Sequence, residues 1–349
     1  MTTIEFSAAQ TRSAFITVRR VIAETSDAKS IEFDVPADRA DDFDARPGQF
    51  VTLRVPDEHG EPLARCYSLS GTPMTGDPLT VTVKRVRGGR ASNWLCDNAV
   101  EGMTLEALPP AGTFTPTSTD DDLLLWGAGS GITPLISILR ATLAGGRGRV
   151  TLVYANRDAD SVIFGDHLRD LMLRYPDRLV VAHWLESMQH LPSAEGLATF
   201  AAAHPTRHSY ICGPAGFSST VRAALDLAGV APHRIHTEVY ASLTGDPFAP
   251  APAADDPDED TVTVEVETAG ERHTIHWPRR LSLVDAMTAQ GVDVPYSCRE
   301  GQCGTCACTV VDGDVTMIDT GVLDEDDVAA GYVLACQARP LGDFVRIRF

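Results

Sequence analysis

Four cysteines in the C-terminal part of the chain have the spacing of an iron-sulfur ligand set. Cys298, Cys303 and Cys306 fall within nine residues, and Cys336 returns from a distant segment. The resulting pattern, C-x4-C-x2-C…C, is typical of proteins that bind a [2Fe-2S] cluster through four thiolates. The sequence therefore predicts a [2Fe-2S] centre held by these four residues.

Other uses of these cysteines fit the spacing less well. Structural zinc favours two short pairs of Cys or His ligands, whereas Cys336 stands alone with no histidine nearby. A Rieske centre would need two histidines in place of two cysteines. Disulfide frameworks are typical of small secreted domains, and we expect no secretory signal at this N-terminus. Gly301 and Gly304 alternate with the ligands, which leaves room for backbone amides to approach the sulfurs.

The chain is strongly acidic, with a formal net charge of −19 over 349 residues. This charge argues against nucleic acids and anionic membranes as partners. No apolar run approaches the roughly 20 residues of a membrane helix, and we expect a cytoplasmic protein. From position 246 onward there are 20 acidic and 7 basic residues. This excess is either an ordinary solvated surface or a means of steering the molecule towards a basic partner.

The regions before the cysteine loop differ in their hydrophobic pattern. The first contains short stretches rich in Val, Ile, Phe and Thr, which predict a small antiparallel β-barrel. The second alternates strand and helix patterns, which predicts a doubly wound parallel sheet. A segment rich in proline, alanine and aspartate separates it from the cysteine module and is typical of a linker. The predicted regions are an arm at 1–14, the barrel at 15–117, the α/β region at 118–245, the linker at 246–260 and the cysteine module at 261–349.

Two stretches of the predicted barrel carry more polar chemistry than a barrel requires. In one strand Arg65 and Tyr67 share a face, while Cys66 and Ser68 lie on the other. After a later strand, the glycine-rich stretch 88–95 opens a helical pattern, and a helix N-terminus of this kind favours a phosphate group. Each stretch by itself most often has only a structural role.

The α/β region begins with a buried strand followed by a glycine-rich loop. The loop reads Gly127-Ala-Gly129-Ser-Gly131-Ile-Thr133-Pro134. Its glycines leave room for a pyrophosphate, Thr133 is suited to cap the next helix, and Pro134 suits the first position of that helix. The loop differs from the Rossmann fingerprint, which requires a glycine where isoleucine stands. It predicts a nucleotide site.

Polar residues or glycines also follow later strands of this region. Asn156 and Arg157 follow the second strand, and Cys212, Gly213 and Pro214 stand at the end of the fourth. Ligands of doubly wound sheets gather at these carboxyl ends. Cys212 could equally be an inert core thiol, which is the commoner role of a buried cysteine.

Taken in order, these motifs resemble the ferredoxin-NADP reductase superfamily, and the cysteine module resembles a plant-type ferredoxin. The resemblance implies a flavin-binding antiparallel barrel, an NAD-binding α/β domain and a β-grasp [2Fe-2S] domain. Together they resemble reductase components of bacterial oxygenases. The motifs are Arg65-x-Tyr67-Ser68, the Gly89 to Ser92 turn, the 127–134 loop and Cys212-Gly213-Pro214-x-x-Phe217.

Three further stretches, at 91–98, 183–187 and 242–248, are similar to the reductases of 3-ketosteroid 9α-hydroxylases. The resemblance implies a route from NADH through FAD and a [2Fe-2S] cluster to a Rieske-type terminal oxygenase. Reductases of phenylacetyl-CoA epoxidase, a diiron enzyme, and of acyl desaturases are also similar, so these acceptors remain alternatives. A non-enzymatic redox carrier or sensor is a further alternative, against which the completeness of the motifs argues.

The resemblance also implies roles for single residues. Arg65 would pair with the flavin pyrophosphate, Tyr67 would pack on the isoalloxazine, and Ser68 would lie near the reactive nitrogen. Cys212 would lie beside the nicotinamide, and Glu238 near the flavin edge. The predicted catalytic residues are Ser68, Cys212 and Glu238, and the predicted cofactor-binding residues are Arg65, Cys66, Tyr67, Ser68, Val83, Lys84, Gly89, Ala91, Ser92, Gly127, Gly129, Gly131, Thr133, Pro134, Asn156, Arg157, Cys212, Gly213 and Pro214.

The choice of cofactor and coenzyme rests on weaker signals. FAD is expected rather than FMN because the most similar reductases bind FAD. NADH is expected rather than NADPH because no basic cluster follows the second strand, where Arg157 is answered by Asp158 and Asp160. The extra thiol Cys308 is either a buried bystander or an oxidisable group near the cluster.

Overall fold

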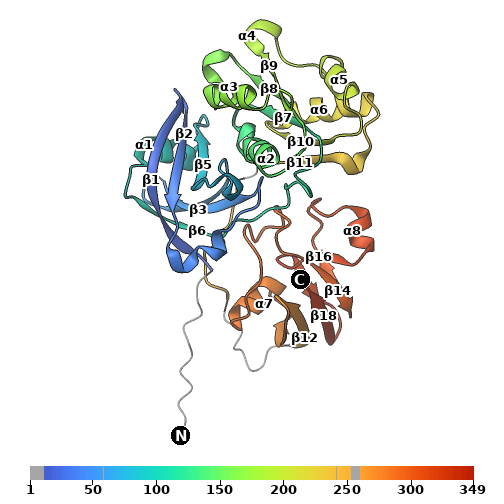
Figure 1. Cartoon of the computed structure of the whole chain (residues 1–349). Coiled ribbons are helices and arrows are strands. Elements are labelled where there is room, and N and C mark those ends of the chain that lie inside the picture. Colours follow the sequence, from blue (N-terminus) through green and yellow to red (C-terminus); the bar gives the residue numbers. More distant parts are fainter. Residues whose placement is uncertain (1–11, 58, 241, 253–259) are drawn as a thin grey trace. The chain divides into compact units, whose positions relative to one another are not determined.

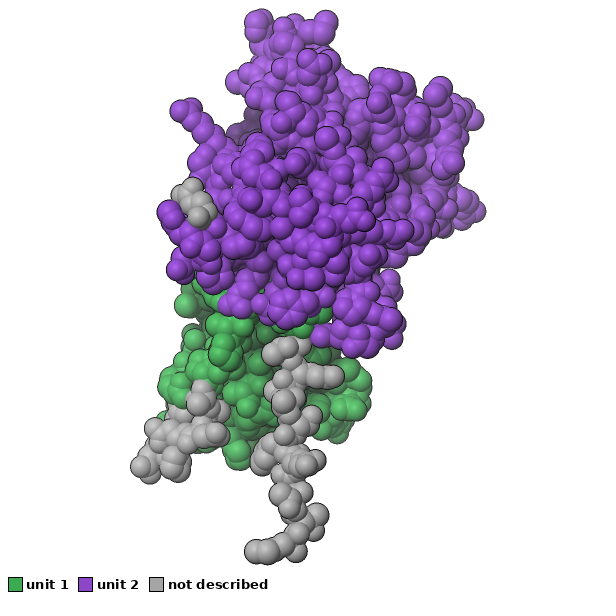
Figure 2. Space-filling model, turned by 90° about the vertical axis from the view of Figure 1, so that its left-hand side faces the viewer, with its two compact units in different colours: residues 1–14, 111–113, 243–349 green, residues 15–110, 114–242 purple. Residues whose placement is uncertain are grey.

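The computed structural model describes residues 12–57, 59–240, 242–252 and 260–349. The chain separates into two compact units, coloured in Figure 2. Unit 2 comprises residues 15–110 and 114–242, and unit 1 comprises the residues up to 14, 111–113 and 243–349. Residues 1–11 of the predicted arm and 253–259 of the predicted linker lie outside the described residues. No helix among the residues described is long and apolar enough to cross a membrane.

The first half of unit 2 is the predicted antiparallel barrel (Figure 1). Its sheet has the order β4-β3-β6-β1-β2-β5. An antiparallel bridge between Leu69 and Val81 joins the two outer strands, which closes the sheet on itself. Helix α1, Arg90–Asn98, follows β5. The strands are β1 Ala14–Thr25, β2 Ala28–Asp34, β3 Phe50–Pro56, β4 Pro62–Ser68, β5 Leu79–Lys84 and β6 Thr104–Ala107.

The second half of unit 2 is the predicted doubly wound sheet, with strand order β11-β10-β7-β8-β9 and parallel pairing. Every residue of β7 and β8 is buried, because helices cover both faces of the sheet. Helices α2 and α3 pack on one face, and α5 and α6 on the other. The elements are β7 Leu123–Ala128, α2 Ile132–Gly145, β8 Val150–Asn156, α3 Gly165–Arg174, β9 Leu179–Leu185, α4 Glu186–Gln189, α5 Ala194–Ala202, β10 His208–Cys212, α6 Ala215–Leu227 and β11 Ile235–Glu238.

Unit 1 contains the predicted β-grasp module. Its main sheet has the order β13-β12-β18-β14-β16, with β12 and β18 parallel and the other neighbours antiparallel. Arg12 belongs to this unit and donates hydrogen bonds to Asp293 and to Val294 O, so the predicted arm is ordered by this point. The elements are β12 Thr261–Thr268, β13 Glu271–Pro278, α7 Leu283–Ala289, β14 Ala307–Asp312, β15 Val315–Met317, α8 Glu325–Ala329, β16 Tyr332–Leu334, β17 Ala338–Pro340 and β18 Phe344–Arg348.

The start of α2 corrects one detail of the sequence prediction. The helix begins at Ile132 with Gly131 at its N-cap, directly after a 3-10 turn at Gly129–Gly131. Thr133 therefore lies inside the first turn, where its hydroxyl donates to Ser130 O over 3.0 Å. The prediction that Thr133 caps the helix is wrong, and Pro134 is its third residue. The 3-10 turn moves the helix start two residues towards the N-terminus.

Candidate functional site

The four cysteines of the predicted cluster come together in unit 1. The thiol of Cys298 contacts those of Cys303 and Cys336, and Cys306 also contacts Cys336. The contact with Cys303 is the main cause that lowers the pKa of Cys298. Four thiolates gathered in this way are the ligand set of a [2Fe-2S] cluster.

The backbone of the cysteine loop supplies donors to the sulfurs. Gly301 and Gly304 adopt φ values of +71° and +70°, which favour glycine. The amides of Glu300 and Gln302 both donate to Cys298 Sγ over 3.4 Å. Amide hydrogen bonds of this kind stabilise thiolate sulfur and tune a cluster's potential. The residues present therefore fit a [2Fe-2S] cluster.

Glu300 connects the cysteine loop to residues 244–245, near the start of the long segment of unit 1. Its Oε1 accepts hydrogen bonds from the amide and the hydroxyl of Thr244, each over 2.8 Å, and from the amide of Gly245. Arg299 donates to Ala249 O over 2.7 Å. The end of the predicted α/β region, at Thr244 and Gly245, and Ala249 of the predicted linker are thus held against the loop. Sequence reasoning did not assign Glu300 a role, although its position between two ligands was a signal.

Cys308 is a structural thiol. It is 2% exposed, and its Sγ donates to Val333 O in the neighbouring strand over 3.7 Å. Burial raises its pKa, which disfavours the reactive thiolate. Of the two roles expected for this residue, the buried bystander fits the structure.

The predicted flavin strand is β4. Its register against β3 pairs Arg65 with Leu53 and Tyr67 with Val51, so Arg65 and Tyr67 share a face as expected. Burial raises the pKa of Tyr67. On the other face, Cys66 Sγ contacts Thr52 Oγ1 at 3.4 Å. The strand therefore offers a cation and an aromatic ring on one side, as a dinucleotide flavin requires.

Helix α1 begins beside this strand without a side-chain cap. Gly89 is its N-cap residue and has no side chain that could accept from the amides of the first turn. The hydroxyl of Ser92 instead accepts from the amide of Val86 over 3.3 Å. Ala91 is buried, and Val83 in β5 accepts from the Cys96 thiol over 3.6 Å. The first-turn amides at this N-terminus suit a phosphate group.

Two of the three predicted catalytic residues, Ser68 and Cys212, contact the hydroxyl of Tyr240, and Glu238 lies next to Cys212. Ser68 Oγ donates to this hydroxyl over 3.4 Å, and Thr133 Oγ1 lies 2.9 Å from it. Cys212 and Glu238 are cross-strand neighbours in β10 and β11, and the Cys212 thiol also contacts the Tyr240 hydroxyl. Sequence reasoning missed Tyr240, whose signal was an aromatic residue two positions after Glu238.

Both acidic groups at this place are mostly neutral at pH 7. Burial raises the pKa of Glu238 to about 8, and its Oε2 has no hydrogen-bond partner within the described part of the chain. Burial also raises the pKa of Cys212, which is fully buried. Cys212 is therefore a thiol and not a nucleophile, and Glu238 is a carboxylic acid that can donate a proton.

The glycines of the dinucleotide loop are required for different structural reasons. A Cβ on Gly131 would lie 2.0 Å from Cys212 O, so this residue must be glycine for the loop to pack on β10. Gly129 has a φ of +53°, and its carbonyl accepts from the Tyr154 hydroxyl over 3.0 Å. A Cβ on Gly127 would lie 3.1 Å from the Leu135 side chain. Close packing against β10 is therefore enough to explain why residue 131 is glycine.

The neighbouring loop after β10 is also tightly packed. A Cβ on Gly213 would lie 2.9 Å from the Phe217 ring and 3.0 Å from the Ala128 side chain. Pro214 is the N-cap residue of α6. Gly213 is half-buried and Pro214 is exposed at the carboxyl end of β10, the edge at which doubly wound folds bind nucleotides.

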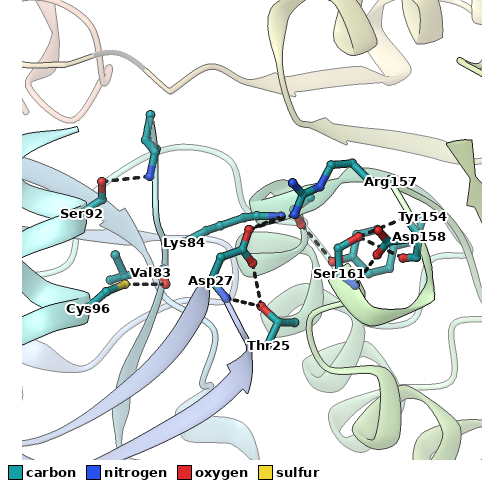
Figure 3. A network of polar contacts seen from close by, with 12 residues as sticks. Thr25, Asp27, Val83, Lys84, Ser92, Cys96, Tyr154, Arg157, Asp158 and Ser161 are labelled. Atoms are coloured by element: carbon teal, nitrogen blue, oxygen red, sulfur yellow. Dashed lines mark hydrogen bonds and ion pairs between the residues drawn. The ribbon is translucent and has the colours of Figure 1, made fainter. Parts of the chain in front are cut away.

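The end of β8 adds a partner to the expected charge pairing. Arg157 Nη2 lies 3.0 Å from Asp27 Oδ2, in the turn between β1 and β2, while Asp158 caps a 3-10 turn at Ala159–Ser161 by accepting from Ser161 N (Figure 3). The bond to Ser161 is the main cause that lowers the pKa of Asp158, and the charge of Arg157 contributes, so Arg157 is answered by Asp158 as expected and by Asp27 in addition. Asn156 is 7% exposed and its amide approaches the Tyr154 hydroxyl, and a bound nucleotide could complete its hydrogen bonds.

Comparison with protein families finds three matches along the chain. Residues 16–115 match an oxidoreductase FAD-binding domain, residues 125–223 an oxidoreductase NAD-binding domain, and residues 266–341 a 2Fe-2S iron-sulfur cluster binding domain. These domains confirm the expected cofactors, which are FAD, NADH and a [2Fe-2S] cluster. The exact domain boundaries stay a prediction.

Full-length relatives carry the same arrangement. The ferredoxin reductase component of 3-ketosteroid-9-alpha-monooxygenase from Rhodococcus rhodochrous is 54% identical and covers 100% of both chains. One of the subunits of 1,2-phenylacetyl-CoA epoxidase from Escherichia coli is 34% identical, covering 96% of this chain and 97% of its own. The solved structure of phthalate dioxygenase reductase matches with a TM-score of 0.55 at 23% identity, over 97% of this chain and 98% of its own.

Proposed function

Since the chain belongs to the family of ferredoxin reductase components of 3-ketosteroid-9-alpha-monooxygenase, we propose that it supplies electrons from NADH to the oxygenase component of such a system. The observation that carries the proposal is the 54% identity over the whole length of both chains. The chain is an oxidoreductase with FAD-binding, NAD-binding and [2Fe-2S] domains. The acceptor is the proposed part, because a docking partner is recognised by surface shape and charge.

Bound FAD accepts a hydride from a nicotinamide and passes on single electrons, which an iron-sulfur cluster takes one at a time. The protein's residues bind and orient these groups. We assign Tyr67 and Arg65 to the flavin, and the 127–134 loop with Asn156 to the coenzyme. The Tyr240 hydroxyl contacts Ser68 of the flavin strand and Thr133 of the dinucleotide loop, so it connects the two proposed binding regions.

In unit 1 the four cysteines would hold the cluster, and the amides of Glu300 and Gln302 would stabilise its sulfur ligands. Glu300 fixes this loop through its bonds to Thr244 and Gly245. A rigid loop changes little in geometry when its charge changes, which favours fast electron transfer to a partner.

The proposed partner is the terminal oxygenase component, in the cytoplasm. The net charge of −19, with 20 acidic and 7 basic residues after position 245, supports an acceptor with a basic docking surface. The same charge speaks against nucleic acids and anionic membranes as partners.

The test is reconstitution of turnover. The purified protein, NADH and a 3-ketosteroid are combined with a purified 3-ketosteroid 9α-monooxygenase oxygenase component, and steroid hydroxylation is measured. In a parallel reaction the oxygenase subunits of phenylacetyl-CoA epoxidase and their substrate replace the steroid system, because a 34% identical relative belongs to that enzyme. Hydroxylation without epoxidation is expected. Epoxidation without hydroxylation would overturn the proposed acceptor and favour the diiron alternative.

A further inference from the structure

A short connector, residues 109–113, joins the FAD-binding barrel to the NAD-binding domain, and the chain is anchored on both sides of it. On the barrel side, the amide of Leu108 donates to Thr52 O over 2.9 Å. On the other side, Phe114 is 8% exposed, and its ring meets the Tyr210 ring edge to face, with centroids 5.2 Å apart. Between these anchors, residues 111–113 belong to unit 1, the unit that contains the four cysteines.

The middle of the connector contacts the cysteine loop within unit 1. The amide of Gly112 donates to Thr305 Oγ1 over 3.1 Å. A Cβ on Gly304 would lie 3.5 Å from Thr113 Cγ2, so the Thr113 side chain packs against this glycine. Gly112 has a φ of +105°, a conformation that favours glycine, so the direction of its amide depends on the residue type. The connector therefore contacts the loop between its second and third cysteine.

The hydroxyl of Thr305 also contacts a cluster ligand. It forms a hydrogen bond with the Cys303 thiol. Because Thr305 Oγ1 accepts from the amide of Gly112, its own hydrogen is available for the Cys303 sulfur. Cys303 is half-buried, whereas the other three predicted ligands are buried. One hydroxyl thus joins the connector to the most accessible sulfur of the four.

We propose that Thr305 is a positioning residue that holds the cysteine loop on the connector and thereby speeds electron passage from the flavin to the cluster. The inference rests on the proposed function and deepens it. In this step one electron leaves the reduced flavin, which NADH supplies with two, and converts one ferric iron of the cluster to ferrous iron. Since the connector continues from the last barrel strand, a loop held on it stays near the flavin domain, and electron transfer slows steeply with distance.

The primary test follows flavin and cluster separately while NADH reduces the holoprotein in an anaerobic stopped-flow experiment. Thr305→Val removes the hydroxyl but keeps the shape of the side chain, so cluster reduction should slow about 2- to 10-fold, the factor that corresponds to one hydrogen bond. Flavin reduction should be unchanged. Thr305→Ser, which keeps the hydroxyl, should restore the rate, and Thr316→Val, an exposed threonine of β15, is the matched control. An unchanged rate in Thr305→Val would overturn the proposal.

Gly112→Ala separates the connector contact from the chemistry of the cluster. A Cβ at a φ of +105° strains the connector, while the bond between Thr305 and Cys303 is retained. Cluster reduction should again slow about 2- to 10-fold. Gly270→Ala is the control, because Gly270 has a φ of +81° in the turn between β12 and β13 and nothing lies within 4 Å of its Cβ. Native electron transfer in Gly112→Ala would mean that the connector has no part in the step, and the proposal would fail.

Two further measurements do not depend on turnover. Deuterium exchange in the peptide that contains residues 111–113 should become about 2- to 10-fold faster in Thr305→Val, because the amide of Gly112 loses its acceptor. Redox titration should show a lower cluster potential in Thr305→Val and an unchanged one in Gly112→Ala, since only the first variant loses a donor to sulfur. Unchanged exchange in Thr305→Val would contradict the proposed role. Native protein whose cluster NADH does not reduce would instead refute the proposed function itself.

Discussion

The cluster loop and the ion-pair rim, formed by Asp27, Lys84 and Arg157, are assembled from the chain in different ways. The loop takes three of its four cysteines from residues 298–306, and the sulfur of Cys298 accepts from two amides of the same stretch. The rim brings together Asp27, Lys84 and Arg157, which belong to a β-hairpin turn, a barrel strand and the end of a strand in the parallel sheet. A site built from one short segment depends on local backbone geometry, whereas the rim depends on how two sheets pack.

The largest effect is expected in the cluster loop, where three ligands lie close together in the sequence. Cys303→Ser removes one of four cluster ligands, so the iron content should fall and electron delivery to cytochrome c should drop at least about 100-fold. NADH-dependent ferricyanide reduction, which draws on the flavin, should persist. Iron analysis and spectra of the reduced protein measure the loss. Cys308→Ala is the control and should retain iron; full iron content in Cys303→Ser would refute the ligand assignment.

Gly131→Ala examines how far the coenzyme region depends on tertiary packing. The added Cβ would meet Cys212 O at 2.0 Å, so we expect destabilisation of about 1–3 kcal/mol or more and a higher KM for NADH. Urea unfolding and steady-state kinetics measure both. Gly216→Ala in α6 is the control, because nothing lies within 4 Å of its Cβ, and helix propensity predicts a gain of up to about 1 kcal/mol. Equal stabilities of the two variants would show that the close approach at Gly131 is not rigid.

Glu300→Gln asks whether the cluster loop depends on a contact outside itself. The charged acceptor for Thr244 and Gly245 would be lost, at a cost of about 1–2 kcal/mol in local stability. The amides of both residues should then exchange faster with deuterium, and the cluster should be lost sooner on warming. Glu325→Gln, an exposed residue of α8, should change neither. Unchanged amide exchange in Glu300→Gln would mean that the loop is self-sufficient.

Glu238→Gln should have the smallest effect below about pH 4.5, where the carboxyl is neutral in the folded protein and still largely protonated in the unfolded chain. Burial raises its pKa from 4.5 to about 8. Between these values the unfolded chain releases the proton and the folded protein keeps it, so this group's contribution to stability falls as the pH rises from about 4.5 to about 8. The variant should lack that decline. Thermal unfolding of both proteins at several pH values compares the slopes, and parallel slopes would contradict the buried carboxylic acid.

Local patterns in the sequence were sufficient for the architecture. Alternating apolar residues predicted the barrel, and the change to strand and helix periods predicted the parallel sheet, because both signals arise from neighbours along the chain. The helix after the dinucleotide loop began earlier than predicted, since a 3-10 turn at Gly129–Gly131 precedes it. Turns of this kind leave little trace in composition.

The cysteine spacing was sufficient to predict the cluster, because the positions of Cys298, Cys303 and Cys306 are set by the short backbone between them, and only Cys336 is brought in by the tertiary structure. The sequence alone did not identify Asp27 as a further partner of Arg157, or Tyr240 as the group that Ser68 and Thr133 contact. It also did not predict the hydrogen bond that the amide of Thr244 donates to Glu300. Each of these contacts joins residues separated by more than 50 positions, so only the packed tertiary structure decided them.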